Sequence, residues 1–472
     1  MKMPPRWAAV LFVLMKLYSK DVAIEHMNCC TLSPTLLSAE AKSMQLASEV
    51  FACPECAGRL LPQTDRIVCS ACDWQTHKHA GVVDILPRAR ESKWNHVDVS
   101  ECERALIANL GLPGGGDDLL AIRAALEPVS PIGNPFFDAE ENLFLDRFNI
   151  SNFYPKVTLG PLYLPDAAGL GEFFHGAIRI INNGEFPVDS NGENAVVVSY
   201  HWRRNGEMEI FEGNRTSIPV AIKPHQSVTV PFAITAPRNE GRYTLDVTVL
   251  QEHKRWHDER TISSEMLISR KAGPVYPDMS RGHQFSEAFD GKLAAQFVDQ
   301  NLELDRNGTA LEIAGGIRPS FRESETGRYW PGTFINSDVS IRLLRIADLL
   351  ARRCGHPETI QARFDANRMP INAGSVDVVF VSRAIHHFED LHAIFSEITR
   401  VLKPAGQLFI LCEPVGVAYD EFTKNLISSG VNEQVFPHGI YERSAKAAGL
   451  RLKEVQCDWG FSFKGMFRKE RP

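Results

Sequence analysis

The chain has 472 residues, of which 44% are hydrophobic and 23% are charged, and its formal net charge is −7 at pH 7. This length exceeds that of one ordinary hydrophobic core and predicts about three domains of globular composition. The mildly negative charge gives no sign of a surface for a polyanion, so nucleic acid is not an expected partner. The ten cysteines include two Cys-x-x-Cys pairs, which favours metal ligation and reduced thiols over a disulfide framework.

The N-terminal part of the chain contains one apolar run, at residues 7–15. A membrane-spanning helix needs about 20 apolar residues, so this run is too short to cross a bilayer. Its length fits the core of a signal peptide, but no small-x-small cleavage site follows it. We therefore expect a cytoplasmic protein without a membrane span, and we interpret residues 1–48 as a poorly ordered tail.

Residues 49–88 are interpreted as a compact module built around four cysteines. These are Cys53, Cys56, Cys69 and Cys72. Two Cys-x-x-Cys turns can bring four thiolates to one ion, which predicts a closed, tetrahedral Zn²⁺ site with a structural role. His77 and His79 are alternative ligands, and the competing interpretations are four unrelated cysteines or a redox dithiol. Together with the segment through Pro87, the module resembles a zinc ribbon often fused to bacterial methyltransferases, and it is similar to the small ribbon protein that activates RNA and protein methyltransferases.

Residues 89–154 show a helical pattern interrupted by glycine and proline, and we interpret them as a helical connector without chemistry. Residues 155–272 change to a period of two, as in the alternation of Val228, Val230 and Phe232 with polar or small residues. Such alternation places one face of a strand on a core and the other in water. Turn signals such as Arg-Asn-Gly-Glu at 204–207 recur between these strands, which predicts an all-β sandwich.

Short motifs in the same segment, among them residues 199–202 and 251–256, resemble an immunoglobulin-like domain attached to bacterial enzymes and transporters of surface polysaccharides. The resemblance implies a carbohydrate or glycolipid precursor as a substrate, by analogy of fold. Trp202 or Trp256, if exposed, would stack on a sugar ring, whereas aromatic residues at strand positions are more often part of a core.

Residues 280–472 alternate strands with amphipathic helices, which predicts a parallel, Rossmann-like α/β sheet. The clearest part is an apolar strand at 376–382, a polar turn, an amphipathic helix and a Lys-Pro-Ala-Gly break at 403–406 before the next strand. In this form the segment resembles the central half of class I S-adenosylmethionine (SAM) methyltransferases. The resemblance is strong over about residues 305–415 and implies methyl transfer from bound SAM.

The first motif of that family aligns with residues 311–318, a strand that leads into a glycine turn. Only Gly316 matches one of the three usual glycines, because Ala314 and Arg318 replace the others. A side chain at the third glycine position would crowd the cofactor. A degenerate domain therefore stays a competing hypothesis, in which the protein is a non-catalytic scaffold or a carbohydrate-binding protein.

The later motifs are implied to bind the nucleoside part of SAM. Asp338 matches the acid that accepts hydrogen bonds from both ribose hydroxyls, and Asp365 matches the residue that faces the adenine amine. Asp377, at the start of the fourth strand, is interpreted as structural. The full set of predicted SAM-binding residues is Glu312, Ala314, Gly315, Gly316, Asp338, Val339, Asp365, Ala366 and Ser382.

His386 and His387 follow the fourth strand, and Glu413 follows the fifth, at the lip of the expected pocket. Imidazole titrates near neutral pH, so either histidine can accept a proton from a hydroxyl group as the methyl group transfers. The alternative is that the pair only packs against the following helix. We take His387, His386 and Glu413 as candidate catalytic residues and expect O-methylation of a small molecule or a glycan precursor. A third hypothesis has the ribbon recruiting a protein or RNA substrate, and the lack of a basic stripe argues against RNA.

Overall fold

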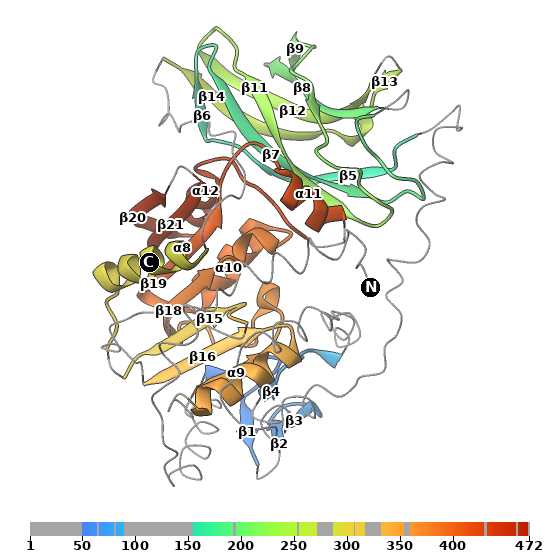
Figure 1. The fold of residues 1–472 in the computed structure, drawn as a ribbon. Coiled ribbons are helices and arrows are strands. Elements are labelled where there is room, and N and C mark those ends of the chain that lie inside the picture. The colour runs from blue at the N-terminus through green and yellow to red at the C-terminus, as the bar shows by residue number, and fades with distance from the viewer. Residues whose placement is uncertain are drawn as a thin grey trace, which may run out of the picture.

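The computed structural model describes residues 50–63, 66–79, 82–88, 154–191, 195–252, 254–270, 287–305, 307–316, 332–353, 359–428, 432–458 and 461–470. Figure 1 shows three parts: a small cysteine module in blue, a two-sheet unit in green, and an α/β unit in yellow to red. The cysteine module and the two-sheet unit lie at opposite ends of the α/β unit. The expected tail at 1–48 and almost all of the expected helical connector at 89–154 fall outside the described residues.

The α/β unit is built on a sheet with the strand order β17-β16-β15-β18-β19-β21-β20. The strands are β15 (Thr309–Ile313), β16 (Thr333–Asp338), β17 (Ile360–Arg363), β18 (Val376–Ser382), β19 (Leu402–Pro414), β20 (Leu450–Asp458) and β21 (Ser462–Lys469). The first five strands in this order, from β17 through β16, β15 and β18 to β19, are mutually parallel, and β21 runs antiparallel between β19 and β20. Because β15 pairs with both β16 and β18, the strand order reverses beside it. In open α/β sheets, ligands bind outside the carboxyl ends of the strands at such a switch point.

Helices cover both faces of this sheet. They are α8 (Glu287–Asn301), α9 (Ile341–Arg353), α10 (Leu391–Val401) and α12 (Ile440–Ala447), with short 3₁₀ turns η4 (Ala366–Arg368) and η5 (Ile385–His387). A further helix, α11 (Glu421–Ser428), packs with the two-sheet unit through Ile427. Phe297 of α8 packs in one cluster with Phe380 and Phe409, whereas α10 and α12 share the opposite cluster with Val379 and Ile410. A strand buried on both faces is continuously apolar, which explains the run of valines in β18.

The cysteine module continues the sheet of the α/β unit. Its strands are β1 (Leu60–Pro62), β2 (Arg66–Cys69), β3 (Gln75–His79) and β4 (Val82–Asp84). Strand β4 pairs in parallel with β17, so one sheet of 11 strands runs through both parts. Ala52 N–H donates to the Pro370 carbonyl at 2.9 Å, and Asn372 N–H donates to the Val50 carbonyl at 2.8 Å. The module is therefore joined to the α/β unit by backbone hydrogen bonds, which its sequence did not predict.

The two-sheet unit has a three-stranded and a seven-stranded sheet on a common core. The first sheet contains β5 (Val157–Tyr163), β7 (Phe173–Asn182) and β11 (Ser227–Thr235). The second contains β6 (Ala167–Gly169), β8 (Val196–Arg204), β9 (Glu207–Ile210), β10 (Thr216–Ser217), β12 (Gly241–Gln251), β13 (Arg255–Trp256) and β14 (Ile262–Ser269). A 3₁₀ turn, η2 (Asp258–Arg260), connects β13 to β14. The predicted hairpin turn joins β8 to β9, with positive φ at Asn205 and Gly206. Trp202 is fully buried in the core, whereas Trp256 is partly exposed.

The two-sheet unit and the α/β unit share side chains. Tyr419, Ile427 and Val435, which lie between β19 and α12, belong to the core cluster of the two-sheet unit. In the other direction, Tyr163 of β5 packs in the main α/β cluster, and its hydroxyl accepts the N–H of Leu391 at 2.9 Å. Among the described residues, none of the helices combines the length and the apolar character that crossing a membrane requires.

Candidate functional site

The four predicted metal ligands lie at one point in the cysteine module. Their sulfurs are all within 4.8 Å of one another. The Cys56 Sγ atom is 3.5 Å from both Cys69 Sγ and Cys72 Sγ, and Cys53 Sγ is 3.6 Å from Cys72 Sγ. A zinc ion with four sulfurs at about 2.3 Å holds them about 3.8 Å apart. The donor set and its spacing therefore fit a closed tetrahedral zinc site.

Local backbone features explain why the cysteines meet. Gly58 lies so close to the cluster that a Cβ there would be 3.0 Å from Cys69 Sγ and 3.1 Å from Cys56 Sγ. The N–H of Ala71 points at Cys69 Sγ, with an N–S distance of 3.3 Å, and such a donor stabilises a thiolate. The side chains of the alternative ligands His77 and His79 fall outside the described part of the structure.

The turn after β15 contains two residues with a left-handed backbone. Ala314 has φ of 53° and Gly316 has φ of 54°, both in the left-handed region. An alanine in this region costs about 1 kcal/mol, so Ala314 is strained where the family usually has glycine. The turn is fastened to the end of β16, because Gly315 N–H donates to the Ser337 carbonyl at 3.0 Å and Asn336 Nδ2 donates to the Gly316 carbonyl at 3.1 Å. Arg318 is not among the described residues.

Asp338 faces this turn from the end of β16. A Cβ on Gly316 would lie 4.0 Å from Asp338 Oδ2, and Asp338 Oδ1 accepts the N–H of Ser340 at 2.8 Å. Burial raises the pKa of Asp338 to about 6, although backbone N–H donors and the charge of Arg363 favour its ionised form. One carboxylate oxygen is therefore committed to the chain, and the other points toward the glycine turn.

The remaining predicted SAM-binding residues also lie at the carboxyl ends of strands, with one exception. Asp365 follows β17 and caps η4, since its Oδ1 accepts both the backbone N–H and the Nδ2 of Asn367 at 2.9 Å. Ala366 is buried at the start of η4, and Ser382 ends β18. Glu312, within β15, is 1% exposed. It is therefore buried within the sheet rather than on the surface.

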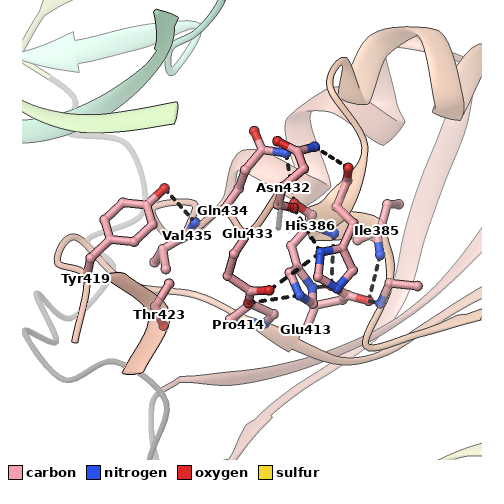
Figure 2. Close-up of polar contacts among 12 residues, drawn as sticks. Ile385, His386, Glu413, Pro414, Tyr419, Thr423, Asn432, Glu433, Gln434 and Val435 are labelled. Carbon is pink, nitrogen blue, oxygen red and sulfur yellow. Dashed lines mark hydrogen bonds and ion pairs between the residues drawn. The ribbon is translucent and has the colours of Figure 1, made fainter. Parts of the chain in front are cut away.

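The sequence predicted that the Glu413 carboxylate lies on the rim of the expected pocket, and this prediction is wrong. Glu413 is fully buried at the end of β19. Its Oε1 accepts the N–H groups of Ala384 and Ile385 at 2.7 and 3.0 Å. Its Oε2 lies 2.6 Å from His386 Nδ1 and 3.2 Å from the His386 backbone nitrogen (Figure 2). Glu413 therefore shapes residues 384–388, which we call the histidine turn.

His386 is held between two buried carboxylates. Its Nδ1 bonds to Glu413, and its Nε2 lies 3.2 Å from Oε1 of Glu433, a residue that the sequence did not single out (Figure 2). Burial by itself lowers the pKa of a histidine, but the charges of Glu433 and Glu413 outweigh it and raise the pKa of His386 to about 10. The ring is therefore an imidazolium at neutral pH, which cannot accept another proton.

His387 is the neutral member of the pair. Its Nδ1 lies 2.9 Å from the carbonyl oxygen of Asn432. A carbonyl only accepts hydrogen bonds, so Nδ1 carries the proton and the lone pair is on Nε2. Although 41% of its side chain is exposed, desolvation of the ring by the surrounding protein and the charge of His386 lower the pKa of His387 below its ordinary value. The imidazole therefore offers an acceptor nitrogen at the protein surface near neutral pH.

Comparison with known proteins gives a family match in this part of the chain and partial matches to curated proteins. Residues 315–410 match the family model of a methyltransferase domain. The chain is 32% identical over 124 residues to the ubiquinone/menaquinone biosynthesis C-methyltransferase UbiE of Paraburkholderia phymatum, covering 24% of this chain and 48% of that protein. It is 33% identical over 87 residues to the malonyl-[acyl-carrier protein] O-methyltransferase of Methylovorus sp., covering 18% of this chain and 29% of that protein. The chain thus spans half or less of the length of these curated relatives.

Among solved structures, the chain is similar to the geranyl diphosphate C-methyltransferase from Streptomyces coelicolor, with a TM-score of 0.32 and 13% identity, over 38% of this chain and 80% of that one. The family match begins at Gly315, within the glycine turn, and includes Asp338 and the strands β16, β17 and β18. The family match and the curated relatives support a class I SAM-dependent methyltransferase domain in this chain.

Proposed function

We propose that this protein transfers a methyl group from SAM to a hydroxyl group of a small molecule or a glycan precursor. The observation that carries the proposal is the neutral His387, whose acceptor nitrogen Nε2 is set by the bond from Nδ1 to Asn432. It follows β18, on the sheet whose neighbouring strands end at the predicted SAM-binding residues. Cofactor and proton acceptor would then lie at the same switch point.

The cofactor would be held by the glycine turn and by Asp338. The positive φ at Gly316 and the space around it let a ligand approach the backbone closely. Asp338 Oδ2 would accept hydrogen bonds from the ribose hydroxyls, while its Oδ1 stays on Ser340. SAM supplies an electrophilic methyl group, whose bond to sulfur breaks as the acceptor oxygen attacks in line.

The two histidines would have different roles. His387 Nε2 accepts the proton that the hydroxyl loses, so no charge is left on the product oxygen. His386 is already protonated and cannot act as the base. It and Glu413 are positioning residues that fix the histidine turn from below. Much of the rate enhancement would come from holding the acceptor and the sulfonium in line.

The proposal also includes a structural zinc ion, a cytoplasmic location and a glycan acceptor. Zn²⁺ bound by the four cysteines would stabilise the cysteine module, and reduced cysteines at such a site fit the expected cytoplasmic location. A glycan acceptor is supported only by the resemblance of the two-sheet unit, because Trp202 is buried and of the two candidate tryptophans only Trp256 is exposed enough to meet a sugar.

Calorimetric titration of the zinc-loaded protein with SAM tests the proposal. We expect binding with a dissociation constant in the micromolar range, since the strain at Ala314 weakens the site only several-fold. Methyl transfer is then measured with labelled SAM against panels of hydroxylated small molecules and glycan precursors. Absence of binding heat and of a thermal shift at millimolar SAM, from folded protein, would refute it. The scaffold hypothesis would then replace it, with Ala314 as the reason for the lost cofactor.

A further inference from the structure

Residues 432–435, which we call the rim segment, separate the two-sheet unit from the histidine turn. Figure 2 shows Asn432, Glu433 and Gln434 arranged over His386. Glu433 forms the ion pair with His386, and the Asn432 carbonyl sets the tautomer of His387. Any element that holds the rim segment in place therefore controls the state of both histidines.

The two-sheet unit holds the rim segment by polar contacts. Arg179 of β7 donates from one terminal nitrogen to Gln434 Oε1 at 3.0 Å and from the other to Asn432 Oδ1 at 3.2 Å. Thr229 of β11 donates its hydroxyl hydrogen to the same Gln434 oxygen. Arg179 and Gln434 are 3% and 1% exposed. These contacts are therefore shielded from solvent, where an electrostatic hydrogen bond is stronger than in water.

The same two amide side chains contact the histidine turn with their nitrogen atoms. Gln434 Nε2 donates to the carbonyl oxygens of His386 and Phe388 at 2.8 and 2.7 Å, and Asn432 Nδ2 donates to the carbonyl of His387. The orientation of both amides is unambiguous, because a guanidinium only donates and a carbonyl only accepts. Asn432 and Gln434 are therefore bridges, with oxygen toward the two-sheet unit and nitrogen toward the histidine turn.

Apolar packing supports the same connection. Val435 lies in the core cluster of the two-sheet unit together with Tyr419. The Tyr419 hydroxyl donates to the Thr229 carbonyl at 2.6 Å. It also accepts the N–H of Val435 at 3.1 Å (Figure 2). The rim segment is thus fixed on one side by the core of the two-sheet unit and on the other by the backbone of the histidine turn.

We infer that the two-sheet unit is a positioning element for the catalytic histidines, acting through Arg179 and Gln434. The inference rests on the proposed function in that it assigns these two residues to the same site. Removing the guanidinium would release Asn432 and Gln434, and the histidine turn would lose three carbonyl contacts. Arg179 also forms an ion pair with Glu389, which follows the histidine turn, with 3.6 Å between Nη2 and Oε1. An ion pair with a buried member is weak evidence for stability alone, so a positional role explains Arg179 better than docking does.

The test compares Arg179→Met with the conservative Arg179→Lys, and with Arg203→Met as a control for the loss of an arginine elsewhere in the two-sheet unit. Arg203 lies in the same unit but pairs with Asp246, at 2.5 Å. The first readout is the titration of the His387 ring by NMR, assigned by its loss in His387→Asn, which needs neither SAM nor an acceptor. The second is the SAM dissociation constant, and the third is kcat with a working acceptor.

In Arg179→Met the pKa of His387 should rise toward the ordinary value of about 6.5, because water reaches the ring more easily once the rim segment is released. We expect kcat to fall at least tenfold with an unchanged SAM dissociation constant, partial restoration in Arg179→Lys, and no change in Arg203→Met. An unchanged His387 titration in folded Arg179→Met would overturn the inference and leave only a docking role.

Two further outcomes are separable. If Arg179→Met does not fold, Thr229→Val removes one donor to Gln434 with little change in shape, and the same shift in the His387 titration is expected from it. An unchanged titration in folded Thr229→Val would then count against the inference. If the titration shifts as expected but no variant binds SAM or transfers a methyl group, the positioning role stands and the proposed function fails.

Discussion

Replacing Asp338 by asparagine isolates the contact that we assign to the SAM ribose. Asparagine keeps a side-chain oxygen in the place of Oδ1, so the bond from the Ser340 N–H and the turn before α9 are preserved. What it loses is the charge and the second acceptor oxygen, the Oδ2 that faces the Gly316 turn. An alanine would remove the Ser340 contact as well and would mix a stability effect with a binding effect.

The magnitude follows from the charge of the acceptor. A hydrogen bond to a charged group contributes about 1.5–3 kcal/mol, and each 1.4 kcal/mol is tenfold in affinity. Asp338→Asn should therefore weaken SAM binding by about 10-fold to 100-fold. Because burial raises the pKa of the Asp338 carboxyl to about 6, SAM affinity of the parent should be constant above pH 7 and should fall as the carboxylate protonates below pH 6.

Calorimetry at several pH values measures both effects in one series. In Asp338→Asn the fall in affinity below pH 6 should disappear, since the amide does not titrate. The variant should also unfold at a slightly higher temperature at pH 7, because it removes a buried carboxylate that is destabilised when ionised. Equal SAM affinities of the parent and the variant, or an undiminished pH dependence in the variant, would show that Asp338 does not bind the cofactor.

Three further predictions concern the other sites. Cys69→Ser should lower the metal content from about one zinc per chain, reduce thermal stability and weaken SAM binding, and full zinc content by elemental analysis would contradict it. The rate of methyl transfer should decline below the lowered pKa of His387 as the base protonates, and His387→Asn should be slow at every pH; a parent rate that stays flat down to pH 4 would contradict this role. The raised pKa of His386 contributes stability that is present below about pH 6.5 and lost as pH rises toward 10. Glu433→Gln should therefore flatten the decline of unfolding temperature over that window, and an identical pH profile would exclude the ion pair.

Sequence patterns predicted the parts of this protein that depend on neighbouring residues. The meeting of the four cysteines could be predicted because each pair lies within a single turn, so two local motifs suffice to bring four sulfurs together. The strand at Val376–Ser382 follows from an apolar run bounded by turn residues, and the helix at Leu391–Val401 follows from the helical spacing of its apolar residues. The glycine turn and Asp338 could be placed because consecutive strands of a parallel sheet end at the same edge.

What the sequence could not give depends on contacts between distant segments. Glu433 lies far along the chain from His386, in a stretch with no motif, and only the folded chain brings the two together. Glu413 was expected on the rim because it follows a strand, but three backbone N–H groups draw its carboxylate inward. The pairing of β4 with β17 has no signal of its own, since any short apolar strand can extend a sheet edge.

The two accessory parts contact different ends of the predicted pocket, which makes their contributions separable. Asp84 of the cysteine module pairs with Arg363 at 3.0 Å, and Arg363 donates to the carbonyl of Val339, next to the proposed ribose-binding Asp338, at 2.9 Å. The two-sheet unit instead contacts the histidine turn through the rim segment. Disturbing the cysteine module should therefore change the SAM dissociation constant first, whereas disturbing the two-sheet unit should change kcat first. Because the contacts are on opposite sides of β15 in the strand order, the two effects should be additive in free energy, as expected for sites without shared partners.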